Sequence, residues 1–378
     1  MDVQPDRAAF VRAHAEGRPQ VMAATLLADL ETPVSAMLKL ASGQPYSFLL
    51  ESVEGGAVRG RYSMIGLKPD LVWRCRGNAA EINRRARFDR HAFEPEALPA
   101  MDSLRALIAE SRIELPAGLP PMAAGLFGHM GYDMVRLMER LPSRNEDRLG
   151  LPDAVFLRPT LMAVFDNVLD RVTVVTPVWP DPGISADRAY DLACERLADA
   201  VDAFDRGIPH LAPRPASQPP EPVSNVTREQ YHRMVERAKA YIVAGDIFQV
   251  VPSQRFSVPF ELPPLSLYRS LRRLNPSPFL FFLDLDGYAL ASSSPEILVR
   301  LRDGKATIRP IAGTRPRGKD READEALARD LLADPKELAE HLMLLDLGRN
   351  DVGRVAEIGS VKVTERFVIE RYSHVMHI

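Results

Sequence analysis

The chain has 378 residues, of which 46% are hydrophobic and 26% charged, a composition typical of a soluble globular protein. Its formal net charge of −3 and its lack of Lys/Arg runs argue against a nucleic-acid partner. No segment approaches the roughly 18 uninterrupted apolar residues of a membrane span, and residues 1–14 lack the regions of a secretory signal. Cys75 and Cys194 match no metal-binding or redox spacing, so we expect a cytoplasmic protein without membrane partners.

The first half of the chain is predicted to be rich in strands. Residues 46–67 and 154–178 are rich in β-branched and aromatic residues and are interrupted by Gly and Asp-Asn turns. Residues 102–115 and 187–207 have the apolar spacing of helices. This half therefore mixes both types of element, without a fixed βαβ repeat.

A proline-rich stretch without periodicity, PHLAPRPASQPPEPVSN, follows at residues 209–225. Such a composition is typical of a linker. We therefore expect an N-terminal region at 1–208, a linker at 209–224 and a second domain at 225–378.

The second domain begins with a predicted helix. Thr227 and Gln230 fit a capping box, and Gly245 fits the end of the helix. An apolar stripe along it predicts burial of one face: Tyr231, Met234, Val235, Ala238, Tyr241 and Ile242. A strand is expected at 246–258 and a short helix at 265–275.

Two hairpins are predicted next, because Asp-Gly pairs between apolar runs are strong turn signals. Asp286-Gly287 joins the runs of the first hairpin, and Asp303-Gly304 joins those of the second. Adjacent hairpins without crossover helices favour antiparallel pairing, so the predicted class is α+β.

A helix is also predicted over residues 334–351, with Asp334 as N-cap and Pro335 at its first position. Its leucines cover nearly every direction, which predicts a buried helix. Glu337 and Glu340 lie three residues apart and so share one face. Buried carboxylates need a cation, and Arg349 or a hard divalent ion such as Mg²⁺ could supply it. The simpler alternative is that Glu337 closes a capping box with Asp334 and that Glu340 is solvated.

Three further motifs carry groups that could do chemistry. SSSPE at 292–296 ends in an acid, RPIAGTRPRG at 309–318 combines a glycine, a hydroxyl and arginines, and RYSHVMHI at 371–378 ends in a histidine. Each motif alone is also compatible with an ordinary surface turn or an incidental histidine.

Together these motifs resemble the chorismate-utilising enzymes, and among them the anthranilate synthase component I family. The resemblance rests on DIFQVVPSQRF, NPSPFLFFLDLDGYALASSSPEILVR, RPIAGTRPRG, ELAEHLMLLDLGRNDVGR and RYSHVMHI, in that order. It extends upstream through SFLLESVEGGAVRGRYSMIG and GLFGHMGYDMVRLMERLP, and so covers most of the chain. It implies a large antiparallel-sheet body of two packed sheets, with helices on the outside.

The resemblance implies an enzyme, a lyase, that converts chorismate and ammonia to anthranilate and pyruvate in tryptophan biosynthesis with Mg²⁺. Ammonia would come from a glutamine amidotransferase subunit, component II. Glu296 matches the general acid that protonates the departing hydroxyl, and His377 matches the histidine of the elimination stage. Glu340 matches a metal ligand, and Glu337 belongs to the same acidic shell and is counted with the catalytic residues.

The chorismate-binding pair of the family matches Gly313 and Thr314. Aminodeoxychorismate synthases usually carry a lysine at the place of Ala312, and isochorismate and salicylate synthases carry one at the place of Gln249. The absence of both lysines favours anthranilate synthase, with those relatives as alternatives.

The resemblance also implies feedback inhibition by tryptophan. Ser52 matches this allosteric site, as do Pro278, Phe279 and Leu280. Plain strand packing is the alternative reading of Phe279 and Leu280. A non-catalytic tryptophan-binding module is a further alternative for the chain.

Family members continue beyond the position of His377 with more substrate-binding residues and a second metal-binding glutamate. We therefore expect the chain to be C-terminally incomplete, with an uncovered apolar face, and to be inactive and aggregation-prone on its own.

Overall fold

A computed structural model describes residues 2–54, 58–119, 122–142, 145–209 and 220–378, with the side chains of 53–59 left aside. The chain divides into two compact units, one formed by 1–209 with 264–378 and the other by 210–263. Most of the predicted linker, residues 210–219, lies outside the described residues. In the part of the chain that is described, no helix is both long and apolar enough to cross a membrane.

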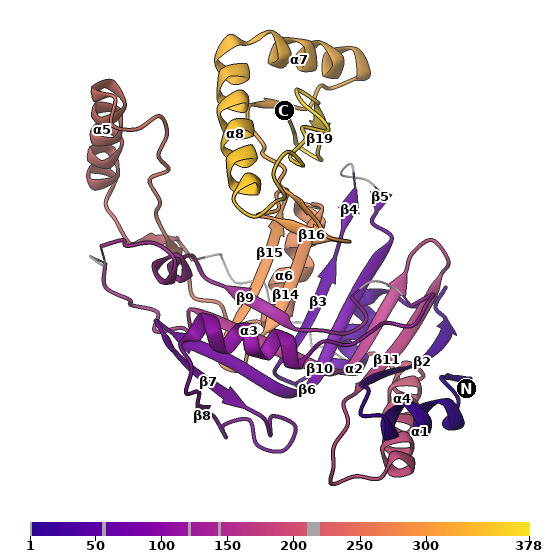
Figure 1. Cartoon of the computed structure of the whole chain (residues 1–378). Helices are drawn as coiled ribbons and strands as arrows, with labels where there is room; N and C mark the ends of the chain where they lie inside the picture. The colour runs from indigo at the N-terminus through magenta and orange to yellow at the C-terminus, as the bar shows by residue number, and fades with distance from the viewer. Residues whose placement is uncertain (1, 55–57, 120–121, 143–144, 210–219) are drawn as a thin grey trace. The chain divides into compact units, whose positions relative to one another are not determined.

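The first unit is built on an eleven-stranded antiparallel sheet (Figure 1). Its main path runs in the order β1-β2-β11-β10-β6-β3-β14-β15, while β9 pairs with β10, and β7 pairs with β6 and with β8. In chain order the strands are β1 (Val3–Gln4), β2 (Gln20–Leu27), β3 (Ser47–Glu51), β6 (Tyr62–Arg76), β7 (Ala79–Asn83), β8 (Glu94–Pro95), β9 (Phe127–Met130), β10 (Ala154–Asp166), β11 (Arg171–Val178), β14 (Phe279–Asp284) and β15 (Ala289–Ser294).

The predicted α+β class and large antiparallel sheet are confirmed. The expectation of two packed sheets differs from the structure. The remaining sheets of the described residues hold only two or three strands each, so a second large sheet packed on the first is not present among them. The small ladders are β4 (Val53–Glu54) with β5 (Val58–Arg59), β12 (Val223–Ser224) with β13 (Phe256–Ser257), β16 (Arg300–Arg302) with β17 (Lys305–Thr307), and β18 (Thr314–Pro316) with β20 (Val375–His377) and β19 (Glu370–Arg371).

The two longest strands, β6 and β10, lie in the centre of the sheet, where most residues of β6 and nearly all residues of β10 are buried. Their ladder shifts register between Arg158 and Pro159, where proline has no N–H to donate. Alternate residues then face opposite sides, so Ile65 and Leu161 join one apolar cluster while Met162 joins another.

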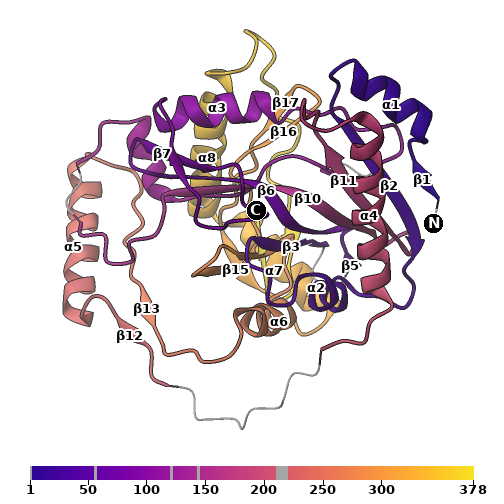
Figure 2. The ribbon, with the colours of Figure 1, turned by 90° about the horizontal axis from the view of Figure 1, so that it is seen from below.

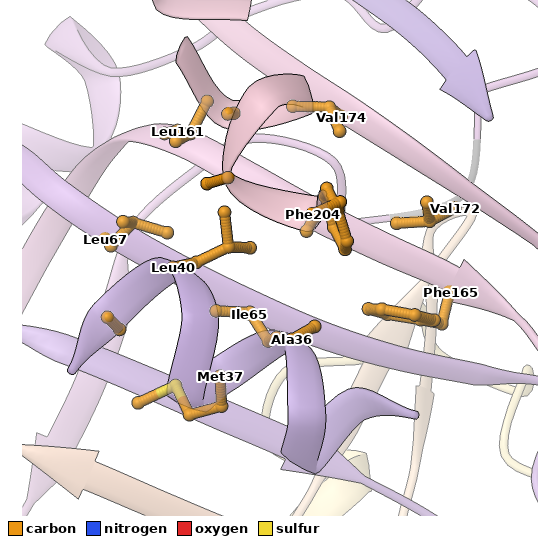
Figure 3. Close-up of a cluster of buried hydrophobic side chains, with 14 of the residues drawn as sticks. Ala36, Met37, Leu40, Ile65, Leu67, Leu161, Phe165, Val172, Val174 and Phe204 are labelled. Atoms are coloured by element: carbon orange, nitrogen blue, oxygen red, sulfur yellow. The ribbon is translucent and has the colours of Figure 1, made fainter. Parts of the chain in front are cut away.

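Helices cover the face of the sheet that carries Ile65 and Leu161. α2 (Pro33–Ala41) packs on β6 and α4 (Ala186–Phe204) on β11, and α1 (Arg7–Ala15) lies along α4 (Figure 2). Figure 3 shows how the side chains of this cluster interlock, among them Met37 and Leu40 from α2 and Phe204 from α4. At the far end, α3 (Ala100–Glu110) and the 3₁₀ helix η1 (Tyr132–Leu137) pack around Trp73.

Segments from both sides of the predicted linker share this sheet. β14 pairs with β3, and α6 (Pro264–Leu274) packs on β14 and β15. Both predicted hairpins are confirmed, and both residues of each turn have positive φ: Asp286 and Gly287 at 57° and 104°, Asp303 and Gly304 at 51° and 72°.

The capping box of α5 (Arg228–Ala244) is confirmed, because Thr227 and Gln230 bond each other's backbone N–H groups. Its predicted buried stripe is wrong, since no residue of α5 is buried. The predicted strand at 246–258 is reduced to Phe256–Ser257. Among the described residues of its unit, 220–263, α5 is accompanied only by the two-residue ladder of β12 and β13, which is too small to form a core.

α7 (Arg321–Ala333) and α8 (Pro335–Gly353) follow the hairpins, and Asp334 caps α8 as predicted. The predicted burial of α8 on all sides is wrong. Only His341 and Gly348 are buried, while Leu342 and Leu347 are each 55% exposed. Its apolar neighbours form a small cluster around Leu331 and Met376, and this cluster covers one side of the helix.

Candidate active site

The three-stranded sheet of β18, β20 and β19 brings three of the predicted residues together. Thr314 stands opposite His377 in the ladder, and the Thr314 Oγ1 lies 3.1 Å from the His377 Nδ1. The Gly313 carbonyl oxygen lies 2.9 Å from the same nitrogen. Because a carbonyl only accepts, Nδ1 must carry the hydrogen, and in the neutral imidazole the lone pair is then on Nε2.

Gly313 also explains how α8 approaches this sheet. Its φ of +69° is a conformation that favours glycine. A Cβ at this position would lie 3.1 Å from the Glu337 Oε2 and 3.0 Å from the Leu331 Cδ1. The side chain of Glu337, 14% exposed, therefore lies directly over Gly313, with the Lys336 Nζ 3.5 Å from its other oxygen.

Glu340 is half-buried on the same face of α8, three residues after Glu337. Within the described ranges, no three His, Cys, Asp or Glu side chains gather into a group that could hold a metal. Mg²⁺ is commonly bound by only one or two carboxylates, together with water and substrate oxygens. The two glutamates offer hard oxygen ligands of this kind, so they fit Mg²⁺ as a partial ligand set.

Glu296 lies between β15 and β16 and is exposed. The Ser294 hydroxyl holds its backbone, accepting from the Glu296 N–H and donating to its carbonyl, both at 3.3 Å. Burial raises the pKa of the nearby Tyr372 phenol, and the charges of Glu370 and Glu296 add to this effect. The charge of Glu296 thus acts on Tyr372, but no hydrogen bond or ion pair of the described residues joins the Glu296 carboxylate to His377.

Sequence reasoning missed Arg309, Glu370 and Tyr372, which lie beside His377. Tyr372 is buried, and its ring centroid is 5.6 Å from that of His377. Its hydroxyl donates to the Glu370 Oε2, and Arg309 pairs with the other oxygen of Glu370. Although burial opposes it, the Arg309 and Tyr372 donors hold the pKa of Glu370 below its usual value. The sequence offered little signal for them: Tyr372 lies within the histidine motif and Glu370 directly precedes it.

The predicted tryptophan-site residues meet at the end of the β3–β14 pair. Leu280 is paired with Glu51, so Ser52 and Phe279 occupy the next positions on the two strands. Leu280 is buried, Phe279 is 37% exposed, and Pro278 precedes them. A Cβ on Gly60 would lie 2.6 Å from the Ser52 Cβ, so the chain passes close to Ser52 there.

Two cavities lie outside these clusters. One of about 1010 Å³ is bordered by α3 and residues 111–116 and contains none of the predicted site residues. The other, of about 550 Å³, is lined by Arg317, Asp324 and Arg371 beside the three-stranded sheet. We place the candidate active site at Gly313, Thr314, Glu337 and His377, because hydroxyl, carboxylate and imidazole groups converge there.

Comparison with known proteins identifies the family of the chain. The family model described as chorismate binding enzyme matches residues 61–378. The chain is 60% identical to anthranilate synthase component 1 of Cereibacter sphaeroides, over 98% of this chain and 74% of that protein. It is 45% identical to the protein of the same name from Pseudomonas aeruginosa, over 99% of this chain and 76% of that one. The chain thus spans about three quarters of the length of these relatives.

Solved structures show the same likeness. The anthranilate synthase component I from Streptococcus pneumoniae TIGR4 superposes with a TM-score of 0.69 at 29% identity, over 93% of this chain and 74% of that one. MenF, the menaquinone-specific isochorismate synthase of Escherichia coli, matches with a TM-score of 0.59 at 15% identity, which shows a shared fold alone.

Proposed function

The chain belongs to the chorismate-binding enzymes, within the anthranilate synthase component 1 family, and from this premise we propose that its active site serves the conversion of chorismate and ammonia to anthranilate and pyruvate. The observation that carries the proposal is the convergence of Gly313, Thr314, Glu337 and His377 from three elements that are distant in sequence. A deamidating component II subunit is the proposed source of the ammonia.

Substrate binding falls to the turn before β18. Gly313 has no side chain, so a ligand can approach its backbone, and the Thr314 hydroxyl can donate to a ring carboxylate. Glu337 and Glu340 would hold Mg²⁺, which when bound neutralises the charge of a substrate carboxylate. The acidic face of α8 then has a role that a capping interaction alone does not give it.

Proton transfers assist both stages of the reaction. In the first stage the nitrogen of ammonia bonds to C2 of the ring while the C4 hydroxyl departs; the proton from Glu296 makes that leaving group water, and the new ammonium group loses a proton. In the second stage the ring loses its C2 proton and the bond from C3 to the enolpyruvyl oxygen breaks, which makes the ring aromatic; the released enolate takes up a proton at its methylene carbon and becomes pyruvate. The His377 Nε2 is the nitrogen available to take the C2 proton, because Nδ1 is engaged by Gly313.

The choice of branch depends on position 312. Ala312 is buried and exchanges backbone hydrogen bonds with Ile378, directly beside the pairing of Thr314 with His377. The side chain of a lysine at position 312 would extend from the backbone next to the candidate active site, where its amine could act as a nucleophile. Alanine cannot, which supports an enzyme that uses ammonia without a covalent intermediate.

Chorismate binding is the direct test. We expect calorimetry with Mg²⁺ present to detect chorismate, and Thr314→Val and His377→Gln to weaken binding or turnover while the exposed His91→Gln leaves both unchanged. Ammonia-dependent anthranilate fluorescence measures turnover in the same samples. A chain that neither binds nor converts chorismate, while its circular dichroism is that of a folded protein, would overturn the proposal.

We further infer feedback inhibition by tryptophan at Ser52, Pro278, Phe279 and Leu280. The supporting observation is that the register of β3 and β14 makes neighbours of residues more than 200 positions apart. Tryptophan bound there would contact both β3 and β14. If it binds one arrangement of these strands and their attached elements more tightly than another, it shifts the population toward that arrangement. We expect Ser52→Arg to abolish tryptophan binding in calorimetry and to leave chorismate binding intact, and equal tryptophan binding by wild type and variant would refute this location.

A further inference from the structure

His377 stands in the middle of a small sheet that restrains it from both sides. It pairs with Thr314 on one side and with Glu370 on the other. Both hydrogen-bond contacts of its ring involve Nδ1, and in the described part of the chain Nε2 has no protein partner. The hydrogen bond to the Gly313 carbonyl determines which ring nitrogen carries the hydrogen. It does not fix the plane of the imidazole ring, which can still rotate about this hydrogen bond.

Tyr372 supplies the missing restraint. Its ring stands at 59° to the His377 ring, with centroids 5.6 Å apart. The tyrosine is held at three points: its hydroxyl donates to the Glu370 Oε2 at 2.7 Å, its carbonyl accepts from the Arg317 Nη1 at 2.6 Å, and its N–H donates to the Val375 carbonyl at 2.8 Å. The tyrosine is therefore held at its hydroxyl and at its backbone, so its ring keeps a fixed position against the imidazole.

Glu370 is itself held in place. Arg309 pairs with its Oε1, so Oε2 remains for the tyrosine hydroxyl. Both carboxylate oxygens therefore accept from a donor, and the charge of the carboxylate is balanced by the guanidinium. The result is a continuous series of contacts from Arg309 through Glu370 and Tyr372 to His377.

We propose that Glu370 and Tyr372 are positioning residues for His377, which fix the plane of its ring and direct Nε2 at the substrate. The catalytic purpose of this arrangement rests on the proposed function. The restraint on the His377 ring is a property of the chain and can be measured without turnover. It predicts that the phenol hydroxyl, rather than the aromatic ring alone, is what keeps His377 in a single arrangement.

The test is nitrogen NMR of the full chain labelled at its histidines, with the His377 signals assigned by their loss in His377→Gln. In the wild type we expect one set of imidazole signals, with Nδ1 protonated and Nε2 unprotonated. Tyr372→Phe keeps the ring and removes only the hydroxyl, and we expect the His377 signals to broaden or to show both tautomers. Tyr132→Phe, at a tyrosine that is 90% exposed, is the matched control and should change nothing.

Variants of the anchor separate positioning from simple packing. Arg309→Lys retains a cation for Glu370 and should keep the wild-type signature, whereas Arg309→Ala should resemble Tyr372→Phe. Unchanged His377 signals in Tyr372→Phe would overturn the proposal whatever the activity. Where turnover is measured, we expect kcat to fall about tenfold to a hundredfold with little change in KM. Altered signals in a chain without chorismate binding would keep the positioning role and reject the proposed function.

Discussion

A buried ion pair between Glu51 of β3 and Arg272 of α6 joins segments from opposite sides of the predicted linker, and its removal tests how much this contact stabilises the fold. The Arg272 Nη2 donates to the Glu51 Oε1 at 2.6 Å, and the Tyr268 hydroxyl donates to Oε2 at 2.7 Å. The Glu51 side chain is 4% exposed and that of Arg272 is 21% exposed. Arg272→Ala would leave a buried carboxylate with one neutral donor and no cation.

The expected loss follows from the burial of each partner. Removing one member of a buried pair costs about 3–5 kcal/mol, because the remaining charge has no compensation. The partial exposure of Arg272 admits water, which places the expected value near the lower limit, about 3 kcal/mol. Tyr268→Phe removes a single hydrogen bond to a charged group and should cost about 1.5–3 kcal/mol.

Urea unfolding followed by tryptophan fluorescence measures these losses. The two tryptophans, Trp73 in β6 and Trp179 just after β11, both belong to the sheet unit, so their emission reports on its unfolding. Arg269→Ala, an exposed arginine on the same helix, is the control and should stay within about 0.5 kcal/mol of wild type. The reasoning fails if Arg272→Ala and Arg269→Ala are equally stable. It also requires Glu51→Leu combined with Arg272→Leu to be more stable than Arg272→Ala, since no unpaired charge remains.

Three further predictions concern two glycines, Gly313 and Gly128, and the carboxylate of Asp324. Gly313→Ala should destabilise the chain by about 1–2 kcal/mol, because alanine is strained at positive φ, and should weaken chorismate binding because its Cβ meets Glu337; thermal melting and calorimetry measure the two effects. Gly128→Ala should cost at least about 1–3 kcal/mol, because the new Cβ would lie 1.8 Å from the Val155 carbonyl oxygen of β10, whereas Gly207→Ala has open space and should melt like wild type; equal melting of the two variants would contradict this. The hydrogen bond from Arg317, with the Gly318 N–H and Arg371, holds the pKa of Asp324 well below its usual value, so this carboxylate stabilises the fold above its unfolded pKa of about 3.9 and loses that effect as the pH falls toward the folded value. Asp324→Asn should therefore be less stable than wild type at pH 7 and should approach it in acid, and a stability difference that does not change with pH would count against this origin.

The sequence predicted those parts of the fold that depend on neighbours along the chain. Both Asp-Gly hairpins and the cap of α8 at Asp334 involve residues within a few positions of one another, and all are present. Local chemistry is enough there, because a turn needs particular φ values and a helix start needs a side-chain acceptor. These predictions would hold wherever the elements finally packed.

Burial was less predictable, because it depends on what packs against an element. The apolar stripes of α5 and α8 suggested covered faces, yet α5 has no buried residue and Leu342 of α8 is half exposed. A hydrophobic pattern shows which face can be buried, whereas the neighbouring element decides whether it is. The same reason explains residues 246–258, where a strand-like sequence finds only a two-residue ladder.

The candidate active-site residues were named through resemblance, since no spacing in the sequence brings Gly313, Glu337 and His377 together. Their convergence depends on a strand at each end of the segment and a helix between, so that residues 24 and 64 positions after Gly313 meet at this glycine with positive φ. Motif matching found the residues that the resemblance assigns to the site, but it assigned no role to Glu370 and Tyr372, whose proposed role comes from the residues they hold. Ladder register and hydrogen bonds reveal such residues, because Glu370 stands opposite His377 and receives the Tyr372 hydroxyl. If the NMR signature of His377 depends on that hydroxyl, the functional unit of this site is the whole three-stranded sheet, and a substitution in β19 will affect catalysis without touching the substrate.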